Sequence, residues 1–150
     1  SAVGEVNVVN LMKETNAVIG GEGNGGIIYP ELHYGRDALV GIALFLTHLA
    51  QSGTKTSLLK ASYPNYTISK NKIQLEEGMD VDGILRDIQG EFSNNEIDTT
   101  DGVKIYFEKE WVHLRKSNTE PIIRIYSESE SEEKANKLAH SIMDKIRALA

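Results

Sequence analysis

The chain has 150 residues, enough for one ordinary domain or two small ones. Hydrophobic residues make up 40% and charged residues 25%, as in soluble globular proteins, and the net charge of −6 argues against nucleic acid as the main partner. The absence of cysteine excludes disulfides and thiolate metal sites. No apolar run approaches the ~18 residues of a membrane span, and we identify no signal peptide. We therefore expect a cytoplasmic protein that binds neither nucleic acid nor membranes. Residues 1–5 resemble the middle of a domain, so we also expect a fragment of a longer protein.

The first third of the sequence predicts mixed α/β structure. Apolar residues near helical spacing predict a helix over 5–14, and the apolar run 17–19 predicts a buried strand. Five glycines in seven residues occupy 20–26. A strongly apolar helix is expected over 38–51, with Asp37 as its capping acid. Because both faces of this helix are apolar, we expect it to be buried on both sides.

A domain boundary is expected near residues 53–64, and the remainder of the sequence predicts a small α+β domain. The predicted order is β-α-β-β-β-α, with one antiparallel sheet backed by two helices. The last helix should begin near Ser129 or Ser131, and Ser129 with Glu132 fits a capping box. The predicted strands are 66–75, 103–108, 111–115 and 122–127, and the first helix is 81–92.

A polar loop between two of these strands, 115–121, is a candidate anion-binding site. A turn-prone loop between strands can direct several backbone N–H groups toward one point. Guanidinium groups suit a tetrahedral phosphate, and each charge-assisted hydrogen bond contributes roughly 1.5–3 kcal/mol. The alternative is a hairpin whose arginines form salt bridges with Glu120 and Glu128. The candidate phosphate ligands are Arg115, Ser117, Asn118, Thr119 and Arg124.

The glycine-rich segment 20–26 is a second candidate site, with Glu22 and Asn24 as its only long side chains. A carboxylate accepts hydrogen bonds from two neighbouring hydroxyls, an amide both donates and accepts, and glycines let the backbone approach a ligand closely. This combination suits a sugar ring. The alternative is a flexible turn with an exposed glutamate. The segment does not match a nucleotide-binding G-x-G-x-x-G context.

The four histidines are scattered, and we expect no metal site in this chain. His113 differs from the others because it lies two residues before Arg115 and should share that residue's face of the strand. It is therefore a candidate residue of the phosphate pocket.

Together these motifs resemble those of the α-D-phosphohexomutases, a superfamily that includes phosphoglucomutase, phosphomannomutase and phosphoglucosamine mutase. The resemblance covers the whole chain in the family's motif order. The motifs that carry it are Gly20-Gly21-Glu22-Gly23-Asn24-Gly25-Gly26, Gly35-Arg36-Asp37, Asp101-Gly102-Val103-Lys104, and Arg115-Lys116-Ser117-Asn118-Thr119-Glu120-Pro121 with Arg124.

The resemblance implies a four-domain enzyme of which this chain is the C-terminal part. Residues 1–55 would end a mixed α/β third domain, and 60–150 would form a fourth domain with a TATA-box-binding-protein-like fold. By the same resemblance, Glu22 and Asn24 bind sugar hydroxyls, and the five candidate ligands of the loop at 115–124 bind the substrate's phosphate.

Family members move a phosphoryl group between the two ends of a hexose phosphate through a bisphosphorylated intermediate. Neither the family's phosphoserine loop nor its aspartate-rich loop for Mg²⁺ occurs in this sequence. We therefore expect the chain to hold recognition elements, to be inactive alone, and to depend on the remaining domains of the same polypeptide, which would bind Mg²⁺.

The sequence leaves the preferred sugar open between a hexose and a hexosamine phosphate. Asn24 and Gly26 replace a serine and a histidine that many relatives carry, and Glu5 stands where some relatives have a histidine. An acid at Glu5 would suit an amino sugar, which makes it a further candidate pocket residue. Two other interpretations also stay open: a stand-alone, non-catalytic phosphosugar-binding module, and a protein-interaction domain that uses an open sheet edge.

Overall fold

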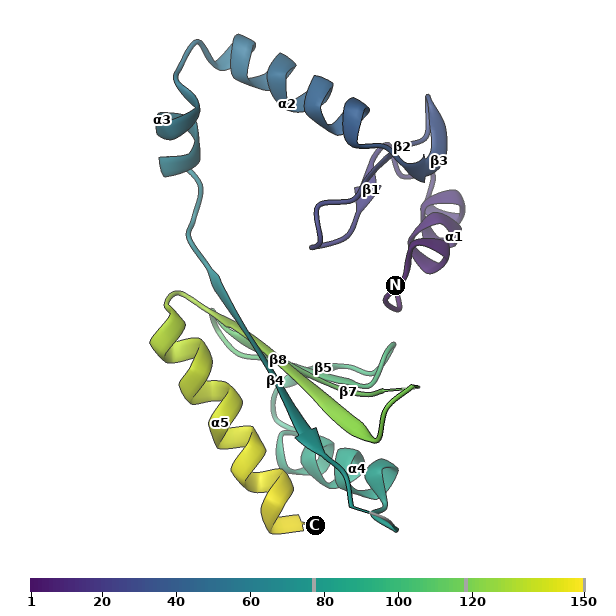
Figure 1. The fold of residues 1–150 in the computed structure, drawn as a ribbon, viewed down its shortest axis with the longest axis vertical. Coiled ribbons are helices and arrows are strands. Elements are labelled where there is room, and N and C mark those ends of the chain that lie inside the picture. Colours follow the sequence, from purple (N-terminus) through teal and green to yellow (C-terminus); the bar gives the residue numbers. More distant parts are fainter. Residues whose placement is uncertain (77, 118, 150) are drawn as a thin grey trace. The chain divides into compact units, whose positions relative to one another are not determined.

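The computed structural model describes residues 1–76, 78–117 and 119–149, and Figure 1 shows its fold. It consists of two compact units, Ser1–Pro64 (unit 1) and Asn65–Ala150 (unit 2). Both units mix helices with antiparallel sheets, which confirms the predicted fold class. No helix in the described ranges is long and apolar enough to cross a membrane.

Unit 1 combines helices with a small sheet. Helix α1 (Glu5–Thr15) precedes strands β1 (Gly20–Gly21), β2 (Ile27–Tyr29) and β3 (His33–Arg36), which pair antiparallel in that order. Helices α2 (Ala38–Ser52) and α3 (Thr56–Ala61) complete the unit. Asp37 caps α2 as predicted, because its side chain accepts hydrogen bonds from the backbone N–H groups of Leu39 (2.8 Å) and Val40 (3.0 Å).

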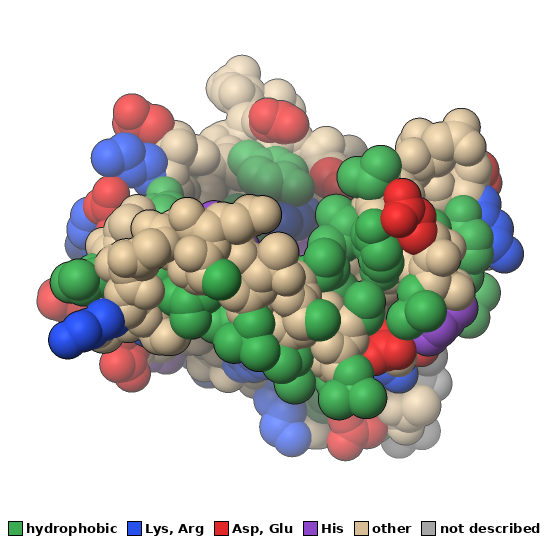
Figure 2. All heavy atoms as spheres, turned by 90° about the horizontal axis from the view of Figure 1, so that it is seen from above, with side chains coloured by type: hydrophobic (Ala, Val, Ile, Leu, Met, Phe, Trp, Pro, Cys, Tyr) green, Lys and Arg blue, Asp and Glu red, His purple; other side chains and the backbone are tan. Residues whose placement is uncertain are grey.

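Two predictions for unit 1 are wrong, and both concern burial. Residues 17–19 form no strand, and Val18 is 79% exposed. Helix α2 is not buried on both sides, since none of its residues is buried and Leu39 is 78% exposed. An apolar pattern predicts what a segment tends to bury, but unit 1 offers few apolar neighbours: its buried hydrophobic side chains are Met12, Ile28 and Leu59. In Figure 2, which views the molecule from the end where α2 is drawn, many hydrophobic side chains lie open on the surface.

Unit 2 is a five-stranded antiparallel sheet in the order β4-β8-β7-β6-β5, with helices α4 and α5 against one face (Figure 1). The helices are α4 (Val81–Glu91) and α5 (Glu132–Leu149). The strands are β4 (Thr67–Gln74), β5 (Glu96–Asp98), β6 (Val103–Tyr106), β7 (Trp111–Lys116) and β8 (Ile122–Ser129).

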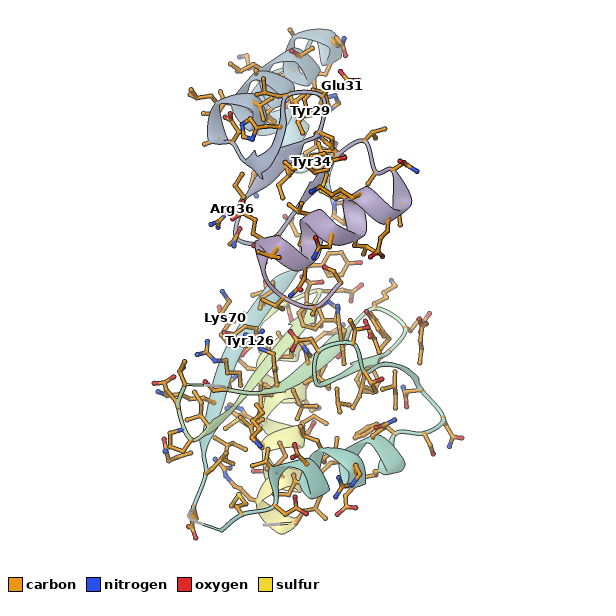
Figure 3. All side chains as sticks on the ribbon, turned by 90° about the vertical axis from the view of Figure 1, so that its right-hand side faces the viewer. Tyr29, Glu31, Tyr34, Arg36, Lys70 and Tyr126 are labelled. Atoms are coloured by element: carbon orange, nitrogen blue, oxygen red, sulfur yellow. The ribbon has the colours of Figure 1, made fainter. Side chains whose placement is uncertain are left out.

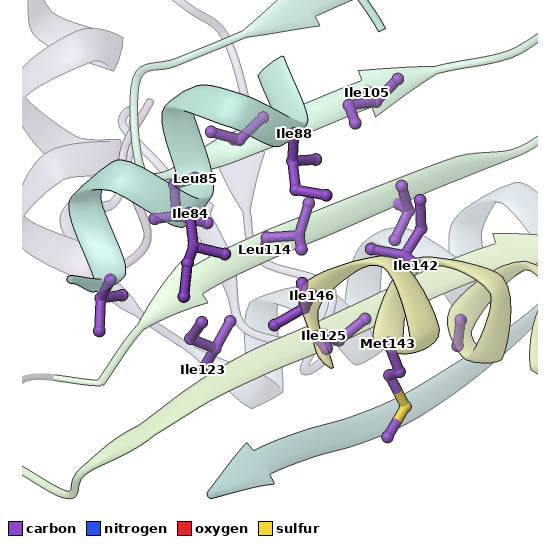
Figure 4. Close-up of a cluster of buried hydrophobic side chains, with 14 residues drawn as sticks. Ile84, Leu85, Ile88, Ile105, Leu114, Ile123, Ile125, Ile142, Met143 and Ile146 are labelled. Atoms are coloured by element: carbon purple, nitrogen blue, oxygen red, sulfur yellow. The ribbon is translucent and has the colours of Figure 1, made fainter. Parts of the chain in front are cut away.

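The core of unit 2 lies between this sheet and its two helices, as Figure 4 shows. Alternation along each strand sends every second side chain to the helix-covered face. The opposite face of the sheet is therefore left for polar side chains. The side chains in the core with no exposed surface include Ile88, Ile105, Val112, Leu114, Ile123, Ile125, Ala139 and Ile146.

Unit 2 differs from the prediction in two details. Strand β5 was not predicted, because its three residues, Glu96 to Asp98, carry one apolar side chain and so show no periodic signal. The predicted capping box of Ser129 and Glu132 is also wrong. Ser129 is the last residue of β8 and is buried, whereas Ser131 accepts a hydrogen bond from the backbone N–H of Lys134 (3.3 Å).

Candidate functional site

The β7-β8 hairpin positions the two arginines that the sequence singled out. Val112 and Leu114 point into the core with no exposed surface, so the residues between and beyond them, His113 and Arg115, lie on the open face. The strand register pairs Arg115 directly with Arg124 of β8. The arginines, nine positions apart in the sequence, thus become cross-strand neighbours on the open face of the sheet.

Each arginine is held by a carboxylate and keeps part of its guanidinium accessible. Arg115 Nη1 lies 3.1 Å from Asp101 Oδ2, and Arg124 Nη2 lies 3.5 Å from Glu120 Oε2. The arginine side chains are 30% and 35% exposed. A guanidinium has five N–H donors, so these contacts leave donors for a ligand. Glu128, the other expected partner, instead accepts a hydrogen bond from the Trp111 indole N–H (2.8 Å).

The loop between these strands carries two hydroxyl groups that lie near each other. The backbone N–H of Ser117 donates to the Ile122 carbonyl (3.0 Å), which closes the hairpin. The hydroxyl oxygens of Ser117 and Thr119 lie 3.4 Å apart. Asn118, the remaining predicted phosphate ligand, lies outside the described residues. The hairpin therefore gathers two guanidinium groups and two hydroxyl groups within one short stretch of chain.

The structure adds Asp101 to this site and explains its position. The Asp101-Gly102 turn joins β5 to β6, and β6 pairs with β7, so the turn lies beside Arg115. His113 Nε2 donates a hydrogen bond to the Asp101 carbonyl oxygen (2.5 Å), because a carbonyl can only accept. The sequence placed Asp101 in one of the motifs that carry the family resemblance but indicated no partner for its side chain. Its role as the partner of Arg115 depends on the strand register, which no local pattern encodes.

In unit 1, Glu22 and Asn24 lie in the hairpin turn between β1 and β2. Glu22 Oε1 accepts a hydrogen bond from the Gly4 N–H (3.1 Å), and Asn24 Nδ2 donates to Glu22 Oε2 (3.3 Å). Asn24 Oδ1 in turn accepts from the Gly26 N–H (2.9 Å). The structure thus brings both predicted sugar ligands together in a hydrogen-bonded turn. Each carboxylate oxygen of Glu22 keeps a lone pair for another donor.

Glu5 lies beside the same turn and is paired with Arg36. Its Oε2 lies 2.8 Å from Arg36 Nε, and its Oε1 accepts from the Arg36 backbone N–H (3.2 Å). Figure 3 labels Arg36. An open depression is lined by Glu5, Asn24, Gly25, Gly26, Ile27, Arg36, Asp37 and Ala38. Glu22 does not line it, and no sequence pattern indicated that Arg36 would pair with Glu5.

Asp37, which also lines this depression, has a carboxyl group whose pKa is lowered. The Val40 backbone N–H, and after it the His33 side chain (3.2 Å), lowers the pKa of its carboxyl below the usual value. In the described ranges, no cluster of three or more histidine, aspartate or glutamate side chains could hold a metal ion. The described side chains therefore do not fit a Mg²⁺ site.

Comparison with known families shows to which family this chain belongs. The model of phosphoglucomutase/phosphomannomutase alpha/beta/alpha domain III matches residues 1–66, and that of the phosphoglucomutase/phosphomannomutase C-terminal domain matches residues 69–145. The chain belongs to the phosphoglucomutase/phosphomannomutase family. The resemblance drawn from the motifs is thereby confirmed.

Three relatives of this phosphohexomutase chain show the extent of the match. It is 43% identical to a phosphoglucomutase/phosphomannomutase of Thermococcus kodakarensis, over 90% of this chain and 30% of that protein. It is 37% identical to a phosphoglucosamine/phosphogalactosamine mutase of Sulfurisphaera tokodaii, over 93% of this chain and 31% of that protein. A probable phosphoglucosamine mutase of Methanopyrus kandleri is 33% identical, over 97% of this chain and 32% of that protein. The chain thus spans about a third of the length of these relatives.

A solved structure supports the fold. The crystal structure of a phosphoglucomutase/phosphomannomutase family protein from Burkholderia thailandensis superposes with a TM-score of 0.74. The match covers 97% of this chain and 31% of that one at 23% sequence identity. At that identity the likeness supports the fold of the phosphohexomutase chain.

Proposed function

We propose that this chain is the substrate-recognition C-terminal part of a phosphohexomutase. The complete enzyme would interconvert the 1-phosphate and 6-phosphate of a hexose or hexosamine through a bisphosphorylated sugar. The observation that carries the proposal is the direct pairing of Arg115 with Arg124 beside a hydroxyl-bearing loop. Two guanidinium groups directly opposite each other on a sheet can direct several N–H donors to one tetrahedral anion, so a phosphate is a fitting occupant.

In this proposal each unit carries residues that recognise part of the substrate. Arg115, Ser117, Asn118, Thr119 and Arg124 hold the phosphate, and His113 keeps the Asp101 turn beside them. Glu22 and Asn24 hold sugar hydroxyls, and Glu5 lies near enough to the same turn to influence which sugar is accepted. The names of the relatives include both hexose and hexosamine enzymes, so the proposal extends to both substrate classes.

The proposal assigns the chemical step to the rest of the polypeptide. Phosphoryl transfer depends on positioning and on neutralising negative charge. The donor serine and the Mg²⁺ that the family uses would belong to domains outside this chain, in a cytoplasmic enzyme. The chain alone would bind without catalysing. The open apolar side chains of unit 1, such as Leu39 on α2, would pack against those domains.

The test is a kinetic comparison of Arg115→Ala and Glu22→Ala in the full-length enzyme. Loss of a charged hydrogen-bonding group costs roughly 1.5–3 kcal/mol, so kcat/KM should fall about 10- to 100-fold for Arg115→Ala. Arg147→Ala is the matched control. Arg147 is an exposed arginine on α5 that pairs with Asp144, and both residues are distant in sequence from the two loops. Unchanged kcat/KM in both test variants would refute the site assignment.

A further inference from the structure

We propose that Lys72 is a third cation of the phosphate site and supplies the positive charge that the two arginines do not. The inference rests on the proposed function, since it deepens the same site. We term Lys72, Arg124 and Arg115 the basic row. Nothing in the sequence motifs pointed to Lys72, which lies in the polar middle of a strand.

The sheet register places Lys72 in line with the two arginines. Lys72 of β4 pairs directly with Arg124 of β8, and Arg124 pairs directly with Arg115 of β7. The neighbouring pair, Ile73 and Ile123, packs on the core side, so Lys72 and Arg124 share the open face. Directly opposed side chains on one face of a sheet have Cβ atoms about 4.5–5.5 Å apart. The basic row therefore runs across three adjacent strands.

Lys72 carries the one positive charge of the basic row that no carboxylate of the described ranges compensates. Arg115 and Arg124 are each paired with one carboxylate, from Asp101 and Glu120. These two pairs together are neutral. Lys72 forms no salt bridge with any carboxylate of the described ranges. A phosphate monoester carries about −1.5 to −2 charge at neutral pH, so an uncompensated cation is what the site otherwise lacks.

The strand that carries Lys72 is fixed to the phosphate loop. The backbone N–H of Leu75 donates to the Pro121 carbonyl (2.9 Å), and Gln74 Nε2 lies 3.1 Å from the same oxygen. Lys72 lies two residues before Gln74, so its backbone is close to the hydrogen bonds that hold β4 to the loop. Its ammonium is a compact charge on a flexible four-carbon stem, so it can reach toward a ligand held by the arginines.

Lys70 provides a matched comparison on the same strand and face. It pairs with Tyr126 rather than with an arginine, and its ammonium lies 5.6 Å from the centre of the Tyr126 ring; Figure 3 labels both residues. Two residues along a strand amount to about 6.6 Å. Lys70 therefore lies about 6.6 Å along the strand from Lys72, on the side away from the loop. Like Lys72 it is a charged, exposed side chain. Removing it changes the overall field of unit 2 without removing a member of the basic row.

The experiment measures KM and kcat of the full-length enzyme for its sugar phosphate in Lys72→Gln, Lys72→Arg, Lys70→Gln and Arg115→Ala. Lys72→Gln is expected to raise KM about 5- to 10-fold, as the loss of one exposed charge-assisted contact. Lys72→Arg should restore KM to within about 2-fold, and Lys70→Gln should change it by less than about 2-fold. The ratio of KM between Lys72→Gln and wild type should also grow between about pH 5.5 and about pH 7.5, as the phosphate loses its second proton. A purely structural lysine would not produce that dependence.

The outcomes separate this inference from the proposed function. If Arg115→Ala lowers kcat/KM while Lys72→Gln leaves KM unchanged, the phosphate site stands and the role of Lys72 is refuted. If Lys70→Gln raises KM as much as Lys72→Gln, the effect is one of diffuse charge and the inference is overturned. If Arg115→Ala has no effect, the proposed function fails and the inference fails with it.

Discussion

At the scale of single residues, the proposed phosphate anchor depends on two arginines that are cross-strand neighbours. Arg115 and Arg124 face each other across two strands, where like charges repel. Asp101 and Glu120 reduce this repulsion, but surface ion pairs contribute only about 0–1 kcal/mol each. A bound phosphate would replace part of these contacts with shorter, charge-assisted hydrogen bonds.

The charge of Asp37 should make the stability of the chain depend on pH. Its pKa is lowered in the folded chain, chiefly by the Val40 N–H and then by His33. A carboxyl whose folded pKa is depressed stabilises the fold above its ordinary pKa, and that contribution is lost as the pH falls through the folded pKa. Asp37→Asn keeps the hydrogen-bond acceptor but not the charge. Its melting temperature should fall less than that of wild type when the pH drops from about 5 to about 3.

Circular dichroism melts of the two proteins across that pH range check this prediction. Other carboxyl groups with lowered pKa values, such as Asp98 and Glu130, titrate in both proteins, so the difference between the two curves isolates Asp37. Parallel curves would contradict the assigned role of the charge.

At the scale of elements, the turn between β5 and β6 connects the fold to the proposed phosphate site. Gly102 has a φ of +84°, and a Cβ there would overlap the Leu114 carbonyl oxygen. Gly53, at the end of α2, has a φ of +62° but nothing within 4 Å of an added Cβ. The two glycines thus share a left-handed backbone and differ in the space around them.

Alanine substitutions at these two glycines should therefore have unequal effects. Gly53→Ala should cost about 1–2 kcal/mol, the strain of a left-handed residue. Gly102→Ala adds a backbone clash and should cost about 3 kcal/mol or more. It should also raise KM for the sugar phosphate, because Asp101 and its partner Arg115 would shift. Urea unfolding and steady-state kinetics measure the two effects, and equal free energies of unfolding for the two variants would contradict this account.

The elements also show what the sequence alone could predict. The strands 111–115 and 122–127 and the helix at 132–149 arise from alternation and from helical spacing, and the structure has them within about two residues. The loop between those strands was predicted as a site because its residue types suit an anion. By contrast, the partnership of Asp101 with Arg115 and the alignment of Lys72 with Arg124 arise from strand register. Register depends on long-range pairing, so no local pattern contains it.

Burial could be predicted only where the neighbours are present. The alternating residues of β7 and the apolar stripe of α5 meet one another in the core of unit 2. Helix α2 is more apolar along its length than α5, yet it has no buried residue. The sequence identified the apolar surface of both helices, but exposure is decided by what packs against that surface.

At the scale of the whole molecule, the two units differ in how much apolar surface they bury. The core of unit 2 joins α4, α5 and strands β6, β7 and β8, with Ile73 of β4 packed against it, whereas unit 1 buries Met12, Ile28 and Leu59. Because slow hydrogen exchange requires opening of the packed core, backbone amides of β7, β8 and α5 should exchange slowest in this chain. Those of α1 and α2 should exchange by local opening at a much lower free energy. Equal protection in both units, measured by hydrogen exchange and NMR, would contradict this picture.

Whether the β7-β8 hairpin anchors a phosphate can be measured by a ligand titration of this chain. Amide shifts would be monitored by NMR as inorganic phosphate, glucose 1-phosphate, mannose 1-phosphate or glucosamine 1-phosphate is added, in wild type and in Arg115→Ala. Phosphate binding by the hairpin predicts shifts at 115–124 for every ligand, with further sugar-dependent shifts at 20–26 if the chain alone recognises the sugar. It also predicts that the shifts at 115–124 are lost in Arg115→Ala. Shifts that avoid the hairpin at millimolar ligand, or that persist unchanged in Arg115→Ala, would contradict it.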